Sequence, residues 1–228
     1  MDALALLLID SRAPAGAHHH SGGMEPAVSA GLVTDIDDLA VFCAGRLATA
    51  GTVAAAFAAA GWGAWAEAAP PSLWGALDAE LDARTPSAAA RRASRLLGGG
   101  VRRLLRAVAP AADVDGAWAD VPSPAPHHPL ALGACVAVGG GDITVAATAA
   151  ALGSVVGPAS AAVRLLGLDP FAVYALLARL GPDVDEVATA GVASARRCAP
   201  ADLPADGAPG LDLLADAHLL EEVRLFAS

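Results

Sequence analysis

Residues 34–61 read TDIDDLAVFCAGRLATAGTVAAAFAAAG and carry the strongest structural signal in the chain. Apolar residues recur there at spacings of three or four, which is the period of one helix face. Thr34 is the expected N-cap, and the acids that follow it favour the positive end of the helix dipole. The pattern predicts one long helix over residues 35–61, with an apolar stripe formed by Ile36, Leu39, Phe42 or Cys43, Leu47, Ala50, Val53 and Phe57.

The composition extends this prediction to the whole chain. Hydrophobic residues make up 55% of the 228 residues, but much of that share is Ala, and only 4% of the chain is aromatic. Ala has the highest helix propensity, whereas strands favour β-branched and aromatic residues. A chain of this length can bury a substantial core. The sequence therefore predicts an all-α fold.

Other helices and loops are indicated by N-cap residues and by the helix-breaking residues Pro and Gly. Thr85 with Pro86 predicts an N-cap and a first helical position, and Asp169 with Pro170 predicts another helix start. The glycine run 98–100 predicts a kink, a break or a close helix crossing. Dense Pro, Asp and Gly mark loops over residues 109–128 and 199–210. We expect one domain over residues 1–228, a bundle of about eight to ten helices.

The charge balance excludes several function classes. The net charge is −10, and all 14 basic residues are Arg, because the chain contains no Lys. A P-loop phosphate site needs its Lys, and a Schiff base needs a lysine amine. Residues 84–106 hold seven of the arginines and no acid, but they contain no aromatic residue. We expect a solvated helix face or a surface for an acidic protein there, and no nucleic-acid site.

Three observations concern the cellular compartment of the protein. Cys43, Cys135 and Cys198 are odd in number and far apart, which is typical of buried thiols in a cytosolic protein. Residues 47–66 and 143–163 lack charges and are long enough to cross a bilayer, but Ala and Gly drive insertion poorly. The N-terminus has no basic region, unlike a signal peptide. We expect a cytoplasmic protein without a membrane span.

Three consecutive histidines lie in RAPAGAHHHSGGMEPA, residues 12–27. Neighbouring residues point in different directions, so His18 and His20 share a face only in an extended backbone. Imidazoles bind nickel and zinc, but the spacing supplies no further ligands. We therefore expect a loop that enters a helix near Glu25. The sequence also lacks the short motifs of hydrolases, zinc proteases and nucleotide-binding enzymes, so neither catalysis nor a cofactor is predicted.

The same region resembles a known family. LLIDSRAPAGAHHHSGGMEPAVSAGLVTD is similar to the N-terminal signature of the UreF family of urease accessory proteins, and its matching positions are Ser11, Pro14, Gly16, Ser21, Gly23, Met24 and Glu25. Three later stretches are similar in the same order, namely LDARTPSAAARRASRLLGGGVRRLLR, HHPLALG followed by SAAVRLLGLDP, and LLADAHLLEEVRLFAS. The chain departs from the pattern at Ala17, at His20, where an aromatic is expected, and in the glycine run 98–100.

The resemblance implies an all-α, non-catalytic chaperone that forms a homodimer. UreF-like proteins bind an accessory protein of the UreD type, also called UreH, and the GTPase UreG, and they assist GTP-dependent nickel insertion into apo-urease. The tail EEVRLFAS suits a docking peptide, although a last helical turn packed on its own core is equally consistent. The residues expected to contact partners are Pro14, Gly16, His20, Ser21, Gly23, Glu25, Arg224, Leu225 and Phe226, followed by the arginines of residues 91–106.

Two other functions stay open on the sequence alone. A histidine-based nickel metallochaperone would bind metal directly through His18, His19 and His20. An Ala-rich membrane protein would use the two uncharged spans. Metal binding by the isolated chain would favour the first, and detergent-dependent solubility would favour the second.

Overall fold

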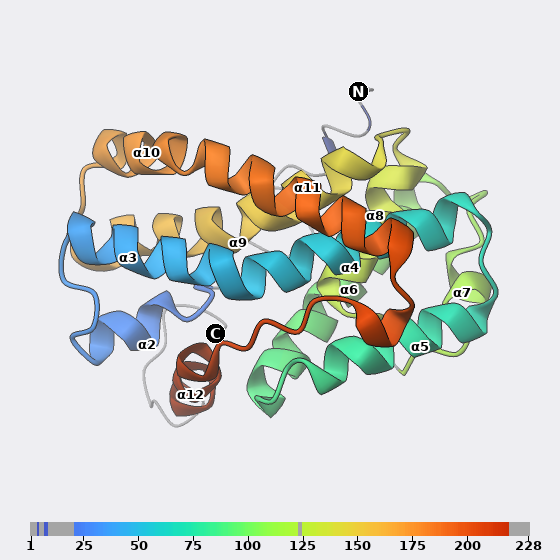
Figure 1. The fold of residues 1–228 in the computed structure, drawn as a ribbon, viewed down its shortest axis with the longest axis horizontal. Coiled ribbons are helices and arrows are strands. Elements are labelled where there is room, and N and C mark those ends of the chain that lie inside the picture. Colours follow the sequence, from blue (N-terminus) through green and yellow to red (C-terminus); the bar gives the residue numbers. More distant parts are fainter. Residues whose placement is uncertain (1–3, 5–6, 9–20, 123–124, 219–228) are drawn as a thin grey trace.

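The computed structural model describes residues 4, 7–8, 21–122 and 125–218, and Figure 1 shows their path. From residue 21 onward the helices are α2 (Met24–Ser29), α3 (Ile36–Arg46), η2 (Leu47–Gly51), α4 (Thr52–Ala66), α5 (Pro71–Ala83), α6 (Ala88–Val108), α7 (Val114–Ala117), α8 (His128–Val138), α9 (Ile143–Leu166), α10 (Pro170–Arg179), α11 (Gly181–Arg197), η3 (Pro200–Asp202) and α12 (Pro209–His218).

The all-α class predicted from the sequence is confirmed. Element η2 is a turn of π-helix, so α3, η2 and α4 form one unbroken helix of 31 residues. Counted in this way, residues 21–122 and 125–218 form ten α-helices, with η3 as a short 3₁₀ turn and no strand. The long helix predicted over residues 35–61 is present and continues to Ala66.

Helix α3 begins one residue later than predicted. Its N-cap is Asp35, whose carboxylate accepts hydrogen bonds from the backbone N–H groups of Asp37 and Asp38 at 2.9 and 3.0 Å. Thr34 lies just before the cap, and its hydroxyl donates to Asp38. A carboxylate both satisfies the free N–H groups of the first turn and matches the helix dipole. Asp35 therefore takes the role that was predicted for Thr34.

Helix α4 lies at the centre of the molecule and packs against α8, α9 and α11. These helices approach very closely. A Cβ added at Gly133 of α8 would lie 2.1 Å from the carbonyl oxygen of Ala58, and one at Gly191 of α11 would lie 2.9 Å from the backbone of Ala55. Only glycine permits such contacts. The Ala- and Gly-rich composition is thus explained by backbone-to-backbone packing around α4.

Two hydrophobic clusters fill the bundle on either side of α4. One is formed by α2, α3, α9, α10 and α11 around residues such as Met24 and Leu39. The other is formed by α5, α6, α7 and α8 around residues such as Trp74 and Leu105. Helix α4 contributes Ala59 to the first cluster and Phe57 to the second. Because both clusters share this helix, the core is continuous across the molecule.

Helix α6 differs from its predicted form in two ways. The N-cap is Ser87, whose hydroxyl accepts from the N–H of Ala90, so the cap lies two residues after the predicted Thr85. The glycine run does not break the helix, which is continuous over Ala88–Val108. A Cβ at Gly98 would lie 1.9 Å from the carbonyl oxygen of Pro126. Of the three alternatives predicted for this run, the close crossing is the one that the structure shows.

Most of the helix starts, helix ends and loops predicted for the second half of the chain are present. Asp169 caps α10 by accepting from the N–H of Phe171, with Pro170 at the first helical position. Residues 139–141 follow the end of α8. In the loop predicted over residues 109–128, the described residues before His128 form no helix other than the short α7. Cys43 and Cys135 are buried free thiols, as predicted, whereas Cys198 is half-buried.

Among the described residues, two helices are long and apolar enough to cross a membrane, Ile36–Ala66 and Ile143–Leu166. Length and composition alone are weak evidence for a span, because the core helix of a soluble bundle has the same character. Both of these helices pack on each other and on several further helices of the fold. They therefore fit the role of central bundle helices.

Candidate partner-binding site at the α2–α12 junction

The predicted partner-contacting residues fall partly within the described chain. Pro14, Gly16, His18, His20, Arg224, Leu225 and Phe226 lie outside the described residues. Ser21 is fully buried, Glu25 is 5% exposed and Gly23 is half-buried. The three described residues thus belong to the packed start of α2.

The start of α2 depends on two glycines with left-handed backbone. Gly22 has φ +60° and Gly23, the N-cap of α2, has φ +91°. A Cβ on Gly22 would also lie 3.0 Å from Cγ of Pro158 and 3.3 Å from Nη2 of Arg46. Other residues would be strained here by both backbone and space. This explains physically why the GG pair precedes Met24.

Helix α12 packs against α2 and α6, as Figure 1 shows at the lower end of the molecule. Leu211 of α12 lies next to Gly23, because a Cβ on that glycine would be 3.7 Å from its Cδ2. The N–H of Ser87 donates to Asp212 at 3.1 Å, and the Ser87 hydroxyl donates to Asp216 at 2.5 Å. Because Ser87 is only 1% exposed, these are sheltered hydrogen bonds.

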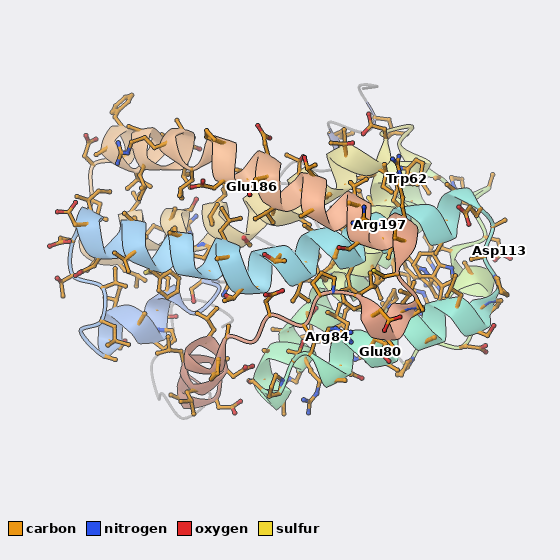
Figure 2. The ribbon with its side chains drawn as sticks, viewed as in Figure 1. Trp62, Glu80, Arg84, Asp113, Glu186 and Arg197 are labelled. Atoms are coloured by element: carbon orange, nitrogen blue, oxygen red, sulfur yellow. The ribbon has the colours of Figure 1, made fainter. Side chains whose placement is uncertain are left out.

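The segment that leads to α12 is held by one arginine. Arg84 of α5 donates to the backbone carbonyls of Ala201, Leu203 and Pro204, each at 2.9 Å. Its guanidinium lies 5.4 Å above the ring of Phe57 and also pairs with Glu80, and Figure 2 shows both charged side chains beneath this segment. The path of the chain into α12 is therefore fixed by α5 and α6.

The helices next to the two predicted partner segments are in contact. Helix α2 follows residues 14–23 in the sequence, α12 precedes the tail, and α2 packs on α12. Exposed apolar side chains lie on both sides, with Leu32 just after α2 at 62% and Leu213 on α12 at 72%. Contiguous exposed apolar patches mark surfaces that bind other proteins, and these two leucines are the large exposed apolar residues that the described chain places at the two helices. We take this α2–α12 junction as the candidate site.

Sequence reasoning missed Ser87, Asp212 and Asp216, which join the site to α6. Asp212 and Asp216 are four residues apart and therefore lie on one helix face. That spacing was the available signal, but nothing local indicates that the face meets the start of α6.

A second group of charged residues joins α5, α6 and the segment before α8, and its acids and its arginine bind one another. Arg95 donates to Asp78 and Asp82, both at 2.7 Å, and its side chain is 12% exposed. Asp78 also accepts from the backbone N–H of His127, and the His127 ring contacts Asp82 at 2.8 Å. The expectation of a solvated arginine face is therefore wrong for Arg95.

Other arginines of the segment fit the expectation better. Arg92 and Arg103 are exposed. Arg102 and Arg106 both bind Asp115, at 2.8 and 2.6 Å, across the α6–α7 turn. Partners from outside the segment therefore decide which arginines are buried.

Asp78, Asp82 and His127 have the side-chain types and the spacing that can hold a metal ion. The guanidinium of Arg95, however, already binds both carboxylates, so the positive charge that a metal would supply is present. Although burial raises the pKa of Asp82, hydrogen bonds from His127 and Arg95 hold it below its usual value. This cluster links α5, α6 and the start of α8 through charged hydrogen bonds, and Nδ1 of His127 is its one buried polar side-chain atom without a partner.

Fold and site together define a helical protein whose candidate site is a surface where helices near the two ends of the chain meet. The UreF family model matches residues 33–181. The chain is 44% identical over 223 residues to the urease accessory protein UreF of Mycobacterium sp. strain JLS, covering 98% of this chain and 97% of the relative. It is 42% identical over 230 residues to the UreF of Mycolicibacterium vanbaalenii, covering all of both chains. The chain belongs to the UreF family of urease accessory proteins.

Proposed function

We propose that this protein is a non-catalytic adaptor in GTP-dependent nickel insertion into apo-urease, acting in the cytoplasm with a UreD/UreH-type protein and a UreG-type GTPase. One observation carries the proposal beyond family membership. The two segments predicted to contact partners join helices α2 and α12, which pack on each other beside exposed apolar residues. A surface built from helices near both chain ends suits recognition of a protein partner.

Within this proposal the site residues have different tasks. Ser21, Gly23 and Glu25 set the course of the N-terminal segment, since they lie in the packed start of α2. Pro14, Gly16 and His20 precede that start and are proposed to contact the UreD-type partner. Arg224, Leu225 and Phe226 are proposed to dock on the same partner from the tail.

A pull-down with a UreD-type protein tests the proposal. The intact chain is compared with a chain that ends at Glu222, which keeps α12 and loses the three predicted contact residues of the tail. We expect a stable complex with the intact chain and strong loss on truncation. Absence of binding by both chains would contradict the adaptor function. Equal binding by both would contradict the role of the tail and place the contact on the helices.

We also propose that the chain forms a homodimer through helix α10. Phe171 is 85% exposed and Tyr174 is 69% exposed, on a helix with no charged residue before Arg179. Large aromatic side chains that remain uncovered on one face are typical of protein interfaces. Asp169 at one end of α10 and Arg179 at the other would pair in an antiparallel arrangement of two copies.

Sedimentation equilibrium tests the dimer. Phe171→Asp combined with Tyr174→Asp is expected to give a monomer, because two buried carboxylates would face the second copy without partners. Leu96→Asp is the matched control, since Leu96 is also an exposed apolar residue, 55% exposed, but lies on α6. A dimer that survives the α10 changes would contradict this interface.

A further inference from the structure

Arg46 occupies an unusual position between three elements. It is the last residue of α3, directly before the π-helical turn, and it is half-buried. Its Nε donates a hydrogen bond to the backbone carbonyl of Ser154 in α9 at 2.8 Å. That carbonyl lacks its usual helical donor, because the residue four positions later is Pro158, which has no N–H. Arg46 thus replaces a missing hydrogen bond inside α9.

The charge of Arg46 is not neutralised within the described chain. The other two deeply placed arginines, Arg84 and Arg95, each bind a carboxylate, but Arg46 forms no ion pair with a described residue. Burial lowers the pKa of Arg46 to about 10. Nearby Cys43 cannot serve as an anion, since burial raises its thiol pKa to about 11. A desolvated cation without a partner is costly, and the cost is relieved when an anion binds.

The surroundings of Arg46 include a second buried donor. Gly22, which has no side chain, faces Nη2 of Arg46, and a Cβ there would lie 3.3 Å from that nitrogen. The hydroxyl of Ser21, the residue before Gly22, is buried without a hydrogen-bond partner. Buried polar groups in folded proteins are nearly always paired. The Ser21 hydroxyl and the Arg46 guanidinium, which has no ion pair among the described residues, are thus two donors on either side of Gly22 that a ligand can use.

The same backbone connects Arg46 to the α2–α12 junction. Gly22 faces Arg46, and Gly23 faces Leu211 of α12. The start of α2 therefore contacts both Arg46 and α12. Of the anions that proteins present, a carboxylate side chain matches the planar fork of a guanidinium, which donates two parallel hydrogen bonds.

We propose that Arg46 is the polar anchor of the candidate site and receives a carboxylate side chain of the protein partner. This inference rests on the proposed function, because it deepens the account of the same partner site. The partner segment is expected to carry an Asp or Glu among apolar residues, which would cover Leu32 and Leu213 while the acid binds Arg46.

Pro158 offers a way to separate binding from folding. Replacing Arg46 alone removes the donor for Ser154 and can destabilise α9. In a Pro158→Ala background, the new N–H of residue 158 satisfies that carbonyl as in an ordinary helix. Arg46 is then dispensable for α9, and its replacement reports on the partner alone.

The experiment measures the dissociation constant of the full-length chain with the UreD-type protein. Four forms are compared: wild type, Pro158→Ala, Pro158→Ala with Arg46→Gln, and Arg92→Gln, which removes an exposed arginine. We expect Pro158→Ala and Arg92→Gln to bind within about twofold of wild type, and the double variant to bind at least about tenfold more weakly than Pro158→Ala. Urea unfolding confirms that the double variant is as stable as its parent.

An Arg46→Lys variant serves as the second arm if the double variant does not fold. It retains the charge and a donor but loses the planar fork, so weaker binding is again expected. Binding by both variants at the strength of their parents would overturn this inference alone. No binding by the wild-type chain would overturn the proposed function together with it.

Discussion

At the scale of single residues, His127 is the group that links stability to pH. Its ring is 1% exposed and contacts Asp82 at 2.8 Å. Burial lowers the pKa of His127, and the hydrogen bond with Asp82 offsets this only in part. The folded chain therefore holds His127 neutral, with Nε2–H donating to the Asp82 carboxylate and the buried Nδ1 left without a partner.

This state predicts that acid destabilises the fold. Because the pKa of His127 is lower in the folded chain than its ordinary value of 6.5, the unfolded chain binds more protons as pH falls below 6.5. The stabilisation is fully present above that value and is lost as pH decreases toward the folded pKa. His127→Gln keeps a donor for Asp82 and cannot titrate, so its stability should fall less between pH 7.5 and 5.5. Urea unfolding at both pH values checks this, and equal losses in the two proteins would contradict it.

At the scale of elements, the α6 crossing can be tested with two glycines. Gly98→Ala places a Cβ 1.9 Å from the Pro126 carbonyl oxygen, which is backbone and cannot rotate away. We expect a loss of stability of about 1–3 kcal/mol or more. Gly153→Ala in α9 has open space around its Cβ and should gain about 0.5–1 kcal/mol, since alanine favours the helix. Thermal or urea unfolding measures both, and similar effects of the two changes would contradict the close crossing.

The presence of the helices was predictable, because the apolar spacing, caps and prolines that indicate a helix lie within a few residues of one another. The period of residues 34–61 and the Asp169–Pro170 start identify their helices directly. Cap positions were less accurate, since Thr34 and Asp35 compete at one helix start and Thr85 and Ser87 at another. The residue that acts as the N-cap is the one whose side chain reaches the first free backbone N–H groups, and a sequence pattern does not contain that geometry.

Contacts between distant elements were not predictable in the same way. Arg95 lies in a segment without acids, yet it is buried because Asp78 and Asp82 come to it from α5. In the sequence, Arg46 is an ordinary position inside the helix predicted over residues 35–61, but Pro158 leaves the Ser154 carbonyl of α9 free to accept from it. Such roles depend on packing that only the folded chain reveals.

At the scale of the whole molecule, the small residues of the core allow the close helix packing that supports the candidate partner site. Close packing of α8, α9 and α11 on α4 builds a continuous helical core. Arg84 and Ser87 then hold the C-terminal segment so that α12 meets α2. Resemblance to UreF proteins predicted two partner segments separately, and the fold packs the helices next to them, α2 and α12, against each other.

The partner site at the α2–α12 junction is tested most directly by hydrogen exchange. Amide exchange of the full-length chain is measured alone and with saturating UreD-type protein. We predict slower exchange on binding at residues 21–29, at the π-helical turn 47–51 and from residue 209 to the end of the chain, with α5 and α7 unchanged. Slower exchange confined to residues 71–117 or 170–179, with none at 21–29 and 209–218, would contradict the account.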